Sequence, residues 1–427
     1  MVHPLSMAPT NTVTAHEGSQ AAGGGKVAGK AVPVGTPDQT MTREEMVAVI
    51  AEMGPRMEER AVDVDLNAEF PWGNFNELRE KGFLALCVPK KYGGMGASYA
   101  DYVRVSEEIG RHCGSTGLTF NMHNATMIWA GEVADMMDMS PEERETHERR
   151  RAEMYRGVVE DGEIHSQPFS EGLLPGALQG TATRAVPVEG GYLVTGRKIF
   201  ASLSGAADRY NVTCQVEGED FLRLLSVRAT DPNAQIVDDW DPLGMRGTVS
   251  RTLLMKDAFV ASDDEILPGG MFDQAAHRYP YLFMSLAPSY LGLTKGILDF
   301  VRQYLRGEVA GAAKGTARRD NVIKQLGWAE MNIKYEQSRA LLYSAIDNAV
   351  LDPSEDELVT AWAGVYTTME HANEVAAKAV RVCGGQSMLK TLPLERMYRD
   401  SRLGSTMLPW SAEVTLQRIG QSRLFDE

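Results

Sequence analysis

The hydrophobic pattern of the chain changes its period twice, and this change limits the folds that the chain can adopt. Apolar residues recur at helical spacing up to about residue 160, alternate from about 162 to 270, and return to helical spacing from about 280. A period of 3.6 residues predicts amphipathic helices, whereas a period of two predicts strands with one buried face. The sequence therefore predicts an α+β protein with an N-terminal α-helical domain, a middle antiparallel β domain and a C-terminal helical domain.

These changes of period place the expected domain boundaries. We expect a helical domain over residues 41–161, a β domain over 162–272 and a second helical domain over 273–427. Residues 1–40 are mostly Ala, Gly, Thr, Ser, Pro and Val without periodicity, so they bury too little apolar area to offset the entropy of ordering. We therefore predict a disordered tail there; a functional arm is the alternative.

Helix starts and stops are marked by capping residues. Thr42–Glu45 matches an S/T-x-x-E capping box, and Ser140–Glu143 combines a Ser cap, a Pro in the first turn and a Glu three residues after the cap. Gly384 and Gly385 stop a long helical segment. In the C-terminal part the periodicity predicts helices over 286–305, 321–349 and 352–382.

In the middle region we predict strands over 181–188, 192–202, 210–216, 221–227 and 251–260. The stretch Gly191–Gly205 is the most informative, because it is rich in β-favouring residues and carries Phe200 and Ser202 near its end. Side chains two residues apart share a face of a regular strand, so we expect an aromatic plane and a hydroxyl donor side by side. An ordinary hairpin strand is the alternative to a strand at a binding site.

Composition excludes several classes of protein. Lys and Arg total 43 against 58 Asp and Glu, a formal charge of −15, whereas a nucleic-acid binder needs a basic face. No apolar run reaches membrane-spanning length and no signal peptide is visible, so we expect a soluble, cytoplasmic protein. The four cysteines fit no zinc spacing, so we expect buried, reduced thiols and no metal site at Cys87, Cys113, Cys214 and Cys383.

Several short motifs occur in a fixed order between about residues 42 and 424. They are PKKYGGMG at Pro89–Gly96, SEEIG at Ser106–Gly110, SQP at Ser166–Pro168, GRKIFAS at Gly196–Ser202, LGMRGT at Leu243–Thr248, GG at Gly384–Gly385 and RMYRDSR at Arg396–Arg402. In order and spacing they resemble the motifs of the acyl-CoA dehydrogenase superfamily. The resemblance implies the fold of that family, in which the C-terminal domain is a four-helix bundle.

The resemblance implies an FAD-dependent dehydrogenase of an acyl-CoA or another acyl thioester. In such an enzyme hydride passes from the β-carbon to flavin N5 while a base removes an α-proton, which leaves an α,β-double bond. Electrons then pass to an electron-transfer flavoprotein or another acceptor. The resemblance also implies a homodimer or homotetramer, because the C-terminal bundles of the family pack together and share the FAD site.

The resemblance assigns cofactor-binding residues around the flavin ring. Phe200 is expected near the ring and the hydroxyl of Ser202 near N5, with Ala201 between them in the same motif. His165 and Ser166 are expected at the pyrimidine edge, where backbone N–H groups of their loop stabilise negative charge on the reduced ring.

Other assignments concern the adenine half of FAD and the substrate. By resemblance, Gly384 and Gly385 let the backbone of a neighbouring subunit approach the adenine half of FAD. Arg246 is expected near the substrate or at an interdomain contact. His123 is either a hydrogen-bonded interior histidine or a group near the substrate end of the flavin.

Neither of the two positions where the family usually carries its catalytic carboxylate holds a carboxylate in this sequence. The position nine residues after Arg399 holds Leu408, and the start of the first C-terminal helix holds Leu282. Leucine cannot accept a proton. The base is therefore Glu413, if the Pro409–Trp410 turn redirects the chain, or a group elsewhere, or no base is needed. In its other interpretation Glu413 is a first-turn residue of the last helix.

These departures leave three hypotheses open. The first is the acyl-thioester dehydrogenase, the second is a flavin-dependent monooxygenase or oxidase acting on a non-thioester substrate, and the third is a non-catalytic homologue. Gly311–Arg319 is also longer than the flavin-clamping turn expected near residue 310. We still expect FAD rather than FMN, because the closing GG and RD elements are retained.

Overall fold

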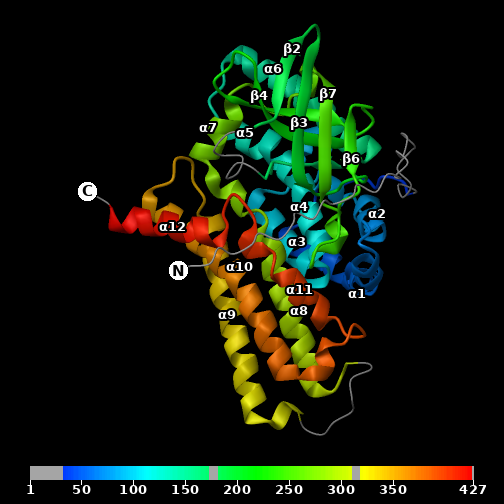
Figure 1. Cartoon of the computed structure of the whole chain (residues 1–427), viewed down its shortest axis with the longest axis vertical. Coiled ribbons are helices and arrows are strands. Elements are labelled where there is room, and N and C mark those ends of the chain that lie inside the picture. Colours follow the sequence, from blue (N-terminus) through cyan, green and yellow to red (C-terminus); the bar gives the residue numbers. More distant parts are fainter. Residues whose placement is uncertain (1–31, 173–180, 310–317, 426–427) are drawn as a thin grey trace, which may run out of the picture.

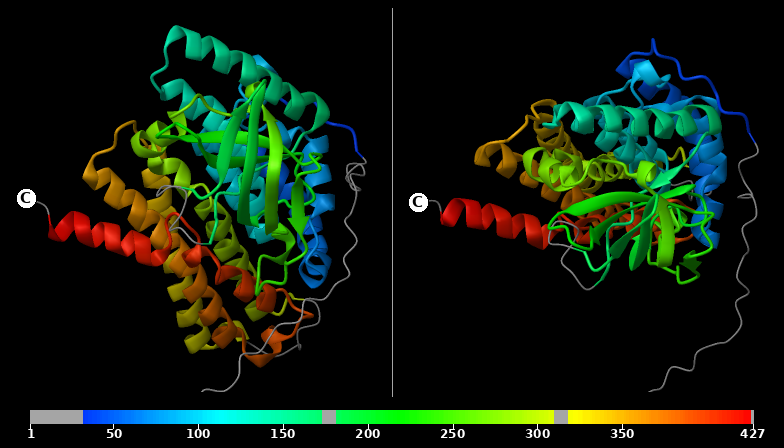
Figure 2. Two further views of the ribbon diagram at one scale, coloured as in Figure 1. Left: turned by 45° about the horizontal axis from the view of Figure 1, so that its top comes forward. Right: turned by 90° about the horizontal axis from the view of Figure 1, so that it is seen from above.

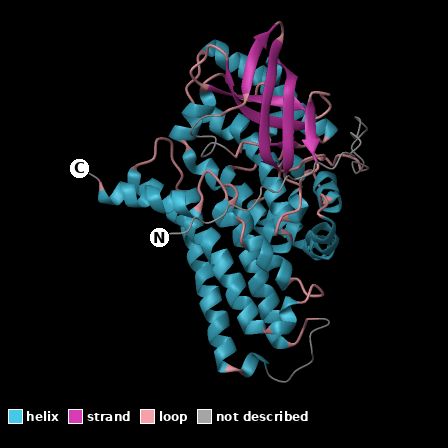
Figure 3. Cartoon of the chain, viewed as in Figure 1, coloured by secondary structure: helices cyan, strands magenta, loops and turns pink. Residues whose placement is uncertain are grey.

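The sheet and the helical bundle lie at opposite ends of the molecule, and the N-terminal helices lie between and beside them (Figures 1 and 3). The computed structural model describes residues 32–172, 181–309 and 318–425. Helices, strands and helices follow one another along the chain, as the change of hydrophobic period predicts. The predicted α+β class is confirmed.

The N-terminal part is helical and begins at the predicted capping box. The Thr42 hydroxyl accepts from the backbone N–H of Glu45, whose carboxylate accepts from the N–H of Thr42, and Ser140 is paired with Glu143 in the same way. Both predicted boxes are confirmed. The helices are α1 (Arg43–Asn67), α2 (Trp72–Glu80), α3 (Tyr99–His112), α4 (Gly114–Ile128), the π-helical η3 (Trp129–Val133), α5 (Ala134–Met136) and α6 (Pro141–Asp161), with short turns η1 (Phe83–Ala85) and η2 (Lys90–Tyr92).

Residues 32–40 belong to the predicted disordered tail, but they pack against the N-terminal helices. Pro37 is buried, and the backbone N–H of Gly35 donates to the carbonyl oxygen of Arg79 at 3.0 Å. The prediction is wrong for this segment, because its prolines and valines supply apolar surface and its backbone finds hydrogen-bond partners. The remainder of the predicted tail, residues 1–31, lies outside the described residues.

The middle part forms one sheet with strand order β1-β4-β2-β3-β7-β6, and β5 pairs with β4. Its strands are β1 (His165–Ser166), β2 (Arg184–Val188), β3 (Gly191–Ala201), β4 (Arg209–Val216), β5 (Leu222–Arg228), β6 (Ala234–Val237) and β7 (Arg251–Ala261). The sequence missed β1 and β6, because strands this short show no alternation. The pairing is mainly antiparallel, as predicted, although β4 runs parallel to β1 and β2. Helix α6 lies on one side of the sheet (Figure 2).

The C-terminal part is a helical bundle whose helices match the predicted ones. Helices α8 (Ala287–Arg306), α9 (Val322–Asp347) and α10 (Glu355–Cys383) run side by side away from the sheet (Figure 1). A fourth helix, α12 (Ala412–Leu424), contacts α10 and projects from the body. The shorter elements of this part are α7 (Met271–Arg278), η7 (Pro280–Met284) and α11 (Leu394–Ser401).

Two glycines let the N-terminal helix α3 approach the bundle closely. A Cβ on Gly110 would lie 2.3 Å from the carbonyl oxygen of Ser289, and one on Gly292 would lie 1.9 Å from that of Glu107. Any larger residue at either place would force α3 and α8 apart. This contact fixes the N-terminal helices on the bundle and so fixes the region between bundle and sheet.

Three findings concern the cysteines, the helices and the acidic and histidine side chains. The four cysteines are buried and free. In the described part of the chain, no helix is both long enough and apolar enough to cross a bilayer. Over the same residues, no cluster of three or more His, Cys, Asp or Glu side chains is arranged to hold a metal ion.

Candidate functional site

The end of strand β3 is irregular where a regular strand was predicted. The pairing of β3 with β7 shifts register between Lys198 and Ala201, and Phe200 has a left-handed φ of 54°. Phe200 is therefore 64% exposed while Ser202 is 7% exposed. The prediction that both side chains leave one face of a regular strand is wrong, because the alternation ends at Phe200.

Ser202 heads a row of three buried hydroxyls. Its Oγ lies 2.8 Å from Oγ of Ser250, which lies 2.7 Å from Oγ1 of Thr248. The backbone joins the same two segments, since the N–H of Leu203 donates to the carbonyl oxygen of Thr248 at 3.0 Å. The turn after β3 is thus held against the segment that leads into β7.

Left-handed backbone conformations gather in these two segments. Non-glycine residues with positive φ include Phe200, Leu203, Met245 and Val249, with φ of 54°, 69°, 51° and 41°. Each costs on the order of 1–3 kcal/mol, and a β-branched residue such as Val249 adopts this conformation least readily. Strain of this kind concentrates at binding and catalytic sites. We therefore place the candidate site where these segments meet.

Strand β1 contributes a fourth hydroxyl, that of Ser166. The Oγ of Ser166 donates to the backbone carbonyl oxygen of Ser202 at 2.6 Å. A carbonyl oxygen only accepts, so the proton of Ser166 is used in this bond. The hydroxyl of Ser166 can therefore only accept from a ligand, which suits a ligand N–H group.

His165 and His123 lie behind this strand. Successive side chains of a strand point to opposite faces, so His165 points away from Ser166, and its Nδ1 lies 3.3 Å from Nδ2 of Asn211. The backbone N–H of His165 donates to Nδ1 of His123 at 3.1 Å, and Nε2 of His123 lies 2.7 Å from the carbonyl oxygen of Leu84. His123 therefore carries its proton on Nε2 and is an interior histidine, which was the first of its two interpretations.

Gln167 has a side-chain donor that no other described residue accepts. Its side chain is 9% exposed, and Nε2 has no hydrogen-bond partner among the described residues. A buried amide without a partner costs about 1–3 kcal/mol, so such a group indicates an acceptor supplied by a ligand. It lies next in the chain to Ser166, so the loop offers an acceptor and a donor in succession.

Arg246 lies at an interdomain contact. Its Nε donates to the backbone carbonyl oxygen of Asp65 in α1 at 2.7 Å, and its Nη1 pairs with Asp241 at 2.6 Å. Of the two expected locations, the interdomain contact is the one observed. A role in substrate binding stays a prediction.

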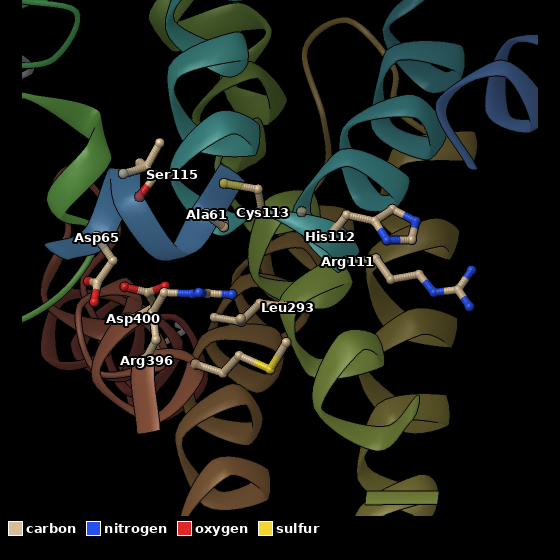
Figure 4. A pocket seen from close by; sticks show the side chains of 13 residues that line it. Ala61, Asp65, Arg111, His112, Cys113, Ser115, Leu293, Arg396 and Asp400 are labelled. Carbon is tan, nitrogen blue, oxygen red and sulfur yellow. The ribbon is translucent and has the colours of Figure 1, made fainter. Parts of the chain in front are cut away.

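The same loop is held from the bundle side by Asp400. A small cavity, with room for about one water molecule (≈10 Å³), lies beside Asp400 and is lined by α1, the α3–α4 junction, α8 and α11. Figure 4 shows Asp65, Arg396 and Asp400 pointing toward one another there. Burial raises the pKa of Asp400 to about 6. This junction connects the bundle to the strained loop.

The two leucines at the usual base positions flank a group of aromatic rings. Leu282 is buried and precedes Phe283, whose ring centroid lies 6.2 Å from that of Trp410. Trp410 follows Leu408 by two residues, and Leu408 is 38% exposed. The rings continue through pairs 5.3–6.5 Å apart among Phe169, Phe272, Trp129, Phe283, Trp410 and Trp362. Leu282 and Leu408 are therefore each within two residues of a ring of this group.

Glu413 lies in the first turn of α12, whose N-cap is Ser411. Its side chain is exposed. The interpretation of Glu413 as a first-turn helix residue is confirmed, and its action as a base stays a prediction.

Gly384 and Gly385 lie at the far end of the bundle. Gly384 caps α10, at the end of that helix away from the sheet (Figure 1). A Cβ on either glycine would meet no atom within 4 Å. Within one chain the pair thus lies at the end of the bundle away from the sheet. Residues 310–317, which include most of the unusual segment before α9, lie outside the described residues.

Sequence reasoning missed Gln167, Ser250 and Asp400 as parts of this region. Gln167 and Asp400 stand inside two of the quoted motifs, so their position was a usable signal. Ser250 follows the LGMRGT motif by two residues, and only the left-handed Val249 brings it beside Thr248.

Comparisons with known proteins show the family of the chain. The family models described as "Acyl-CoA dehydrogenase, N-terminal domain" and "Acyl-CoA dehydrogenase, C-terminal domain" match residues 36–132 and 284–422. A putative acyl-CoA dehydrogenase of Bacillus subtilis, YdbM, is 24% identical over 376 residues, which cover 86% of this chain and 93% of that protein.

Solved structures share the fold. KijD3 in complex with FMN and a dTDP-linked amino-keto sugar has a TM-score of 0.77 at 20% identity, covering 94% of this chain and 97% of that one. The dibenzothiophene monooxygenase TdsC from Paenibacillus sp. A11-2 has a TM-score of 0.74 at 19% identity, covering 88% and 96%.

Proposed function

This chain belongs to the acyl-CoA dehydrogenase superfamily, and from that premise we propose that it is a flavin-dependent monooxygenase or oxidase acting on a non-thioester substrate. One feature of the sequence supports the proposal. By the motif resemblance, leucines (Leu282 and Leu408) stand at both usual positions of the family's catalytic carboxylate. The rings of Phe283 and Trp410, which are close to these leucines in sequence, lie 6.2 Å apart. Neither leucine removes an α-proton, so desaturation of a thioester has no base at either place.

The cofactor of the protein is a flavin, and the residues of the strained segments fit one. The pyrimidine edge of a flavin carries two carbonyl acceptors and one N–H donor. The unsatisfied Nε2 of Gln167 suits a carbonyl, and the acceptor-only hydroxyl of Ser166 suits the N–H. When bound, the flavin supplies two-electron redox chemistry. We expect Ser202 to lie beside N5 and FAD to be preferred over FMN.

A second subunit completes the FAD site in this proposal. Gly384 and Gly385 have open space around them, and one chain places them at the opposite end of the bundle from the sheet. Helix α9 also exposes a set of large apolar side chains: Val322, Ile323, Leu326 and Ile333, each more than half exposed. An exposed apolar stripe on a helix marks an interface. We therefore expect a homodimer or homotetramer.

An acyl-thioester dehydrogenase that passes electrons to an electron-transfer flavoprotein is the second candidate. Two observations favour it: the curated relative YdbM carries that family name, and Glu413 lies three residues after Trp410 at the start of α12. In this alternative Glu413 serves as the base when substrate is bound. The side chain of Glu413 is exposed, which favours the monooxygenase or oxidase.

Oxygen consumption by the reduced protein tests the proposal. The flavin-loaded protein, reduced with a flavin reductase and NADH, is mixed with a panel of apolar aromatic and amine substrates, and both oxygen uptake and product mass are followed. The proposal expects substrate-dependent incorporation of one oxygen atom by the reduced protein. For an oxidase it expects peroxide release when the substrate itself reduces the oxidised flavin, in a sample without NADH. Oxygen uptake that no substrate changes, in a protein that binds flavin, argues against it.

A further inference from the structure

Thr248, Ser250 and Ser202 form the buried row of hydroxyls described above, with exposed fractions of 1%, 7% and 7%. Side chains two residues apart on an extended strand lie about 7 Å apart. The left-handed φ of 41° at Val249 instead brings the oxygens of Thr248 and Ser250 to 2.7 Å. The backbone of Val249 is therefore strained, and its strained conformation places the Thr248 and Ser250 hydroxyls within hydrogen-bond distance.

The direction of the hydrogen bonds in the row follows from counting protons. Each hydroxyl has one proton, so three hydroxyls joined by two bonds leave one proton unused. That proton is on Thr248, on Ser202, or on Ser250 if both neighbours donate to Ser250. Among the described residues, Ser250 is the only hydrogen-bond partner of the Thr248 hydroxyl. If the row ran from Ser202 toward Thr248, the Thr248 proton would be buried without an acceptor among the described residues. If both neighbours donated to Ser250, the Ser250 proton would be buried without one. Either arrangement costs about 1–3 kcal/mol. The favoured direction is therefore from Thr248 through Ser250 to Ser202.

We propose that Thr248 and Ser250 are positioning residues that hold the hydroxyl of Ser202 as a hydrogen-bond donor toward flavin N5. The inference rests on the proposed function, because it takes the ring to lie beside Ser202. We infer the direction of each hydrogen bond. Thr248 donates to Ser250, Ser250 donates to Ser202, and the hydroxyl proton of Ser202 points to the ligand.

This direction has a consequence for the redox state of the bound ring. N5 of the oxidised ring is an acceptor, whereas N5 of the two-electron-reduced ring carries a proton and is a donor. A Ser202 hydroxyl that is fixed as a donor can therefore hydrogen-bond to N5 of the oxidised ring. It cannot accept from the N5–H of the reduced ring, because its proton points at that N–H. The row makes the protein bind oxidised flavin more tightly, relative to reduced flavin, than a freely rotating Ser202 would.

The test compares dissociation constants for oxidised and reduced flavin with the midpoint potential of the loaded protein. Ser250→Ala frees Ser202, so the ratio of the two constants should change about three- to tenfold in favour of reduced flavin. A tenfold change raises the potential of a two-electron couple by about 30 mV. Ser250→Thr keeps a hydroxyl and should keep the wild-type potential. Ser226→Ala, a buried serine of strand β5, is the matched control and should not shift it.

Ser202→Ala separates the inference from the proposed function. If Ser202→Ala shifts the midpoint potential and Ser250→Ala does not, the flavin lies beside Ser202 but Ser250 does not orient the Ser202 hydroxyl. That result overturns the inference and leaves the placement of the flavin intact. Wild-type potentials in both variants, or a protein that binds no flavin, overturn the placement of the ring and with it the inference. If Ser250→Ala does not fold, Ser250→Cys replaces it, since a thiol is a weak donor of similar size; a wild-type potential in that variant also overturns the row.

Discussion

The carboxylate of Asp400 accepts a hydrogen bond from the backbone N–H of Met245 at 2.5 Å, which joins helix α11 of the bundle to the strained loop of the β domain. Met245 is one of the left-handed residues that precede the hydroxyl row. The neighbouring Arg399 pairs with both carboxylate oxygens of Asp65 in α1, at 2.9 and 2.5 Å. One turn of α11 therefore holds all three parts of the chain around the candidate site.

The buried carboxyl of Asp400 predicts a specific dependence of stability on pH. Burial raises its pKa from the ordinary 3.8 to about 6, so the folded chain keeps this proton to a higher pH than the unfolded chain does. The free energy of unfolding should therefore fall by up to about 3 kcal/mol as the pH rises from about 4 through 6. Asp400→Asn still accepts from Met245 and has no proton to lose, so it should gain stability relative to wild type over that interval.

Denaturant unfolding at several pH values checks this prediction. Asp220→Asn is a suitable control, because Asp220 is exposed and its carboxyl has no burial to relieve. Parallel stability curves for Asp400→Asn and wild type between pH 4 and 7 would show that Asp400 does not titrate as described.

Lys198 is expected to be essential for the stability of the β domain. Its side chain is fully buried, and Nζ donates to Glu171 at 2.6 Å and to the carbonyl oxygen of Thr213 at 2.9 Å. Lys198→Met leaves the carboxylate of Glu171 buried without its partner, so we expect a loss of about 3–5 kcal/mol in chemical denaturation. Arg149→Met removes an exposed pair with Asp263 and should cost less than about 1 kcal/mol.

The double variant Glu171→Gln with Lys198→Met distinguishes the cost of an unpaired charge from the cost of lost packing. It removes both charges together, so it should be more stable than Lys198→Met alone. A double variant less stable than the single one would mean that lost packing, and not the unpaired charge, dominates the cost.

The fold followed from the sequence because its signals are local. Capping boxes at Thr42 and Ser140 and the glycine stop at Gly384 depend on neighbouring residues only, and the structure places helix ends at all three. Strands of five or more residues were found for the same reason. The two-residue strand β1 was missed, because two residues are too few to show alternation.

The candidate site was less predictable, because it depends on backbone departures from regular structure. Alternation predicted that Phe200 and Ser202 share a face, but the left-handed φ at Phe200 separates an exposed ring from a buried hydroxyl. The contact between Ser250 and Thr248 likewise needs the left-handed Val249. The sequence pattern does not predict a positive φ at Val249, because β-branched residues normally avoid that conformation.

A change on the exposed face of α9 should separate the subunits. Ile323 is 78% exposed, and a charge placed there would be buried without a partner in any interface that covers this face. We expect Ile323→Lys to shift the oligomer toward monomer in sedimentation velocity and to weaken FAD binding. Val62→Lys, at an exposed apolar residue of α1, should leave the assembly intact. A monomeric wild-type protein that binds FAD normally would refute the shared site.

Restoring a carboxylate at a usual base position should change the reaction. Leu408 is partly exposed and lies two residues before Trp410, so Leu408→Glu can be accommodated without burying a charge fully. We expect this variant to gain thioester-dependent reduction of the flavin, by about two orders of magnitude if the new carboxylate acts as a general base. Leu408→Gln has nearly the same shape without the base and should show no gain. Equal rates in the two variants would mean that this position does not face the substrate.

Anaerobic mixing of the wild-type, flavin-loaded protein with a panel of short-, medium-, long- and branched-chain acyl-CoAs tests the central claim most directly. The visible absorbance of the flavin reports its reduction. With Leu282 and Leu408 at the base positions, the account predicts that the absorbance persists with every thioester while a chemical reductant bleaches it. Rapid bleaching by any acyl-CoA would contradict it and establish a base-driven dehydrogenation.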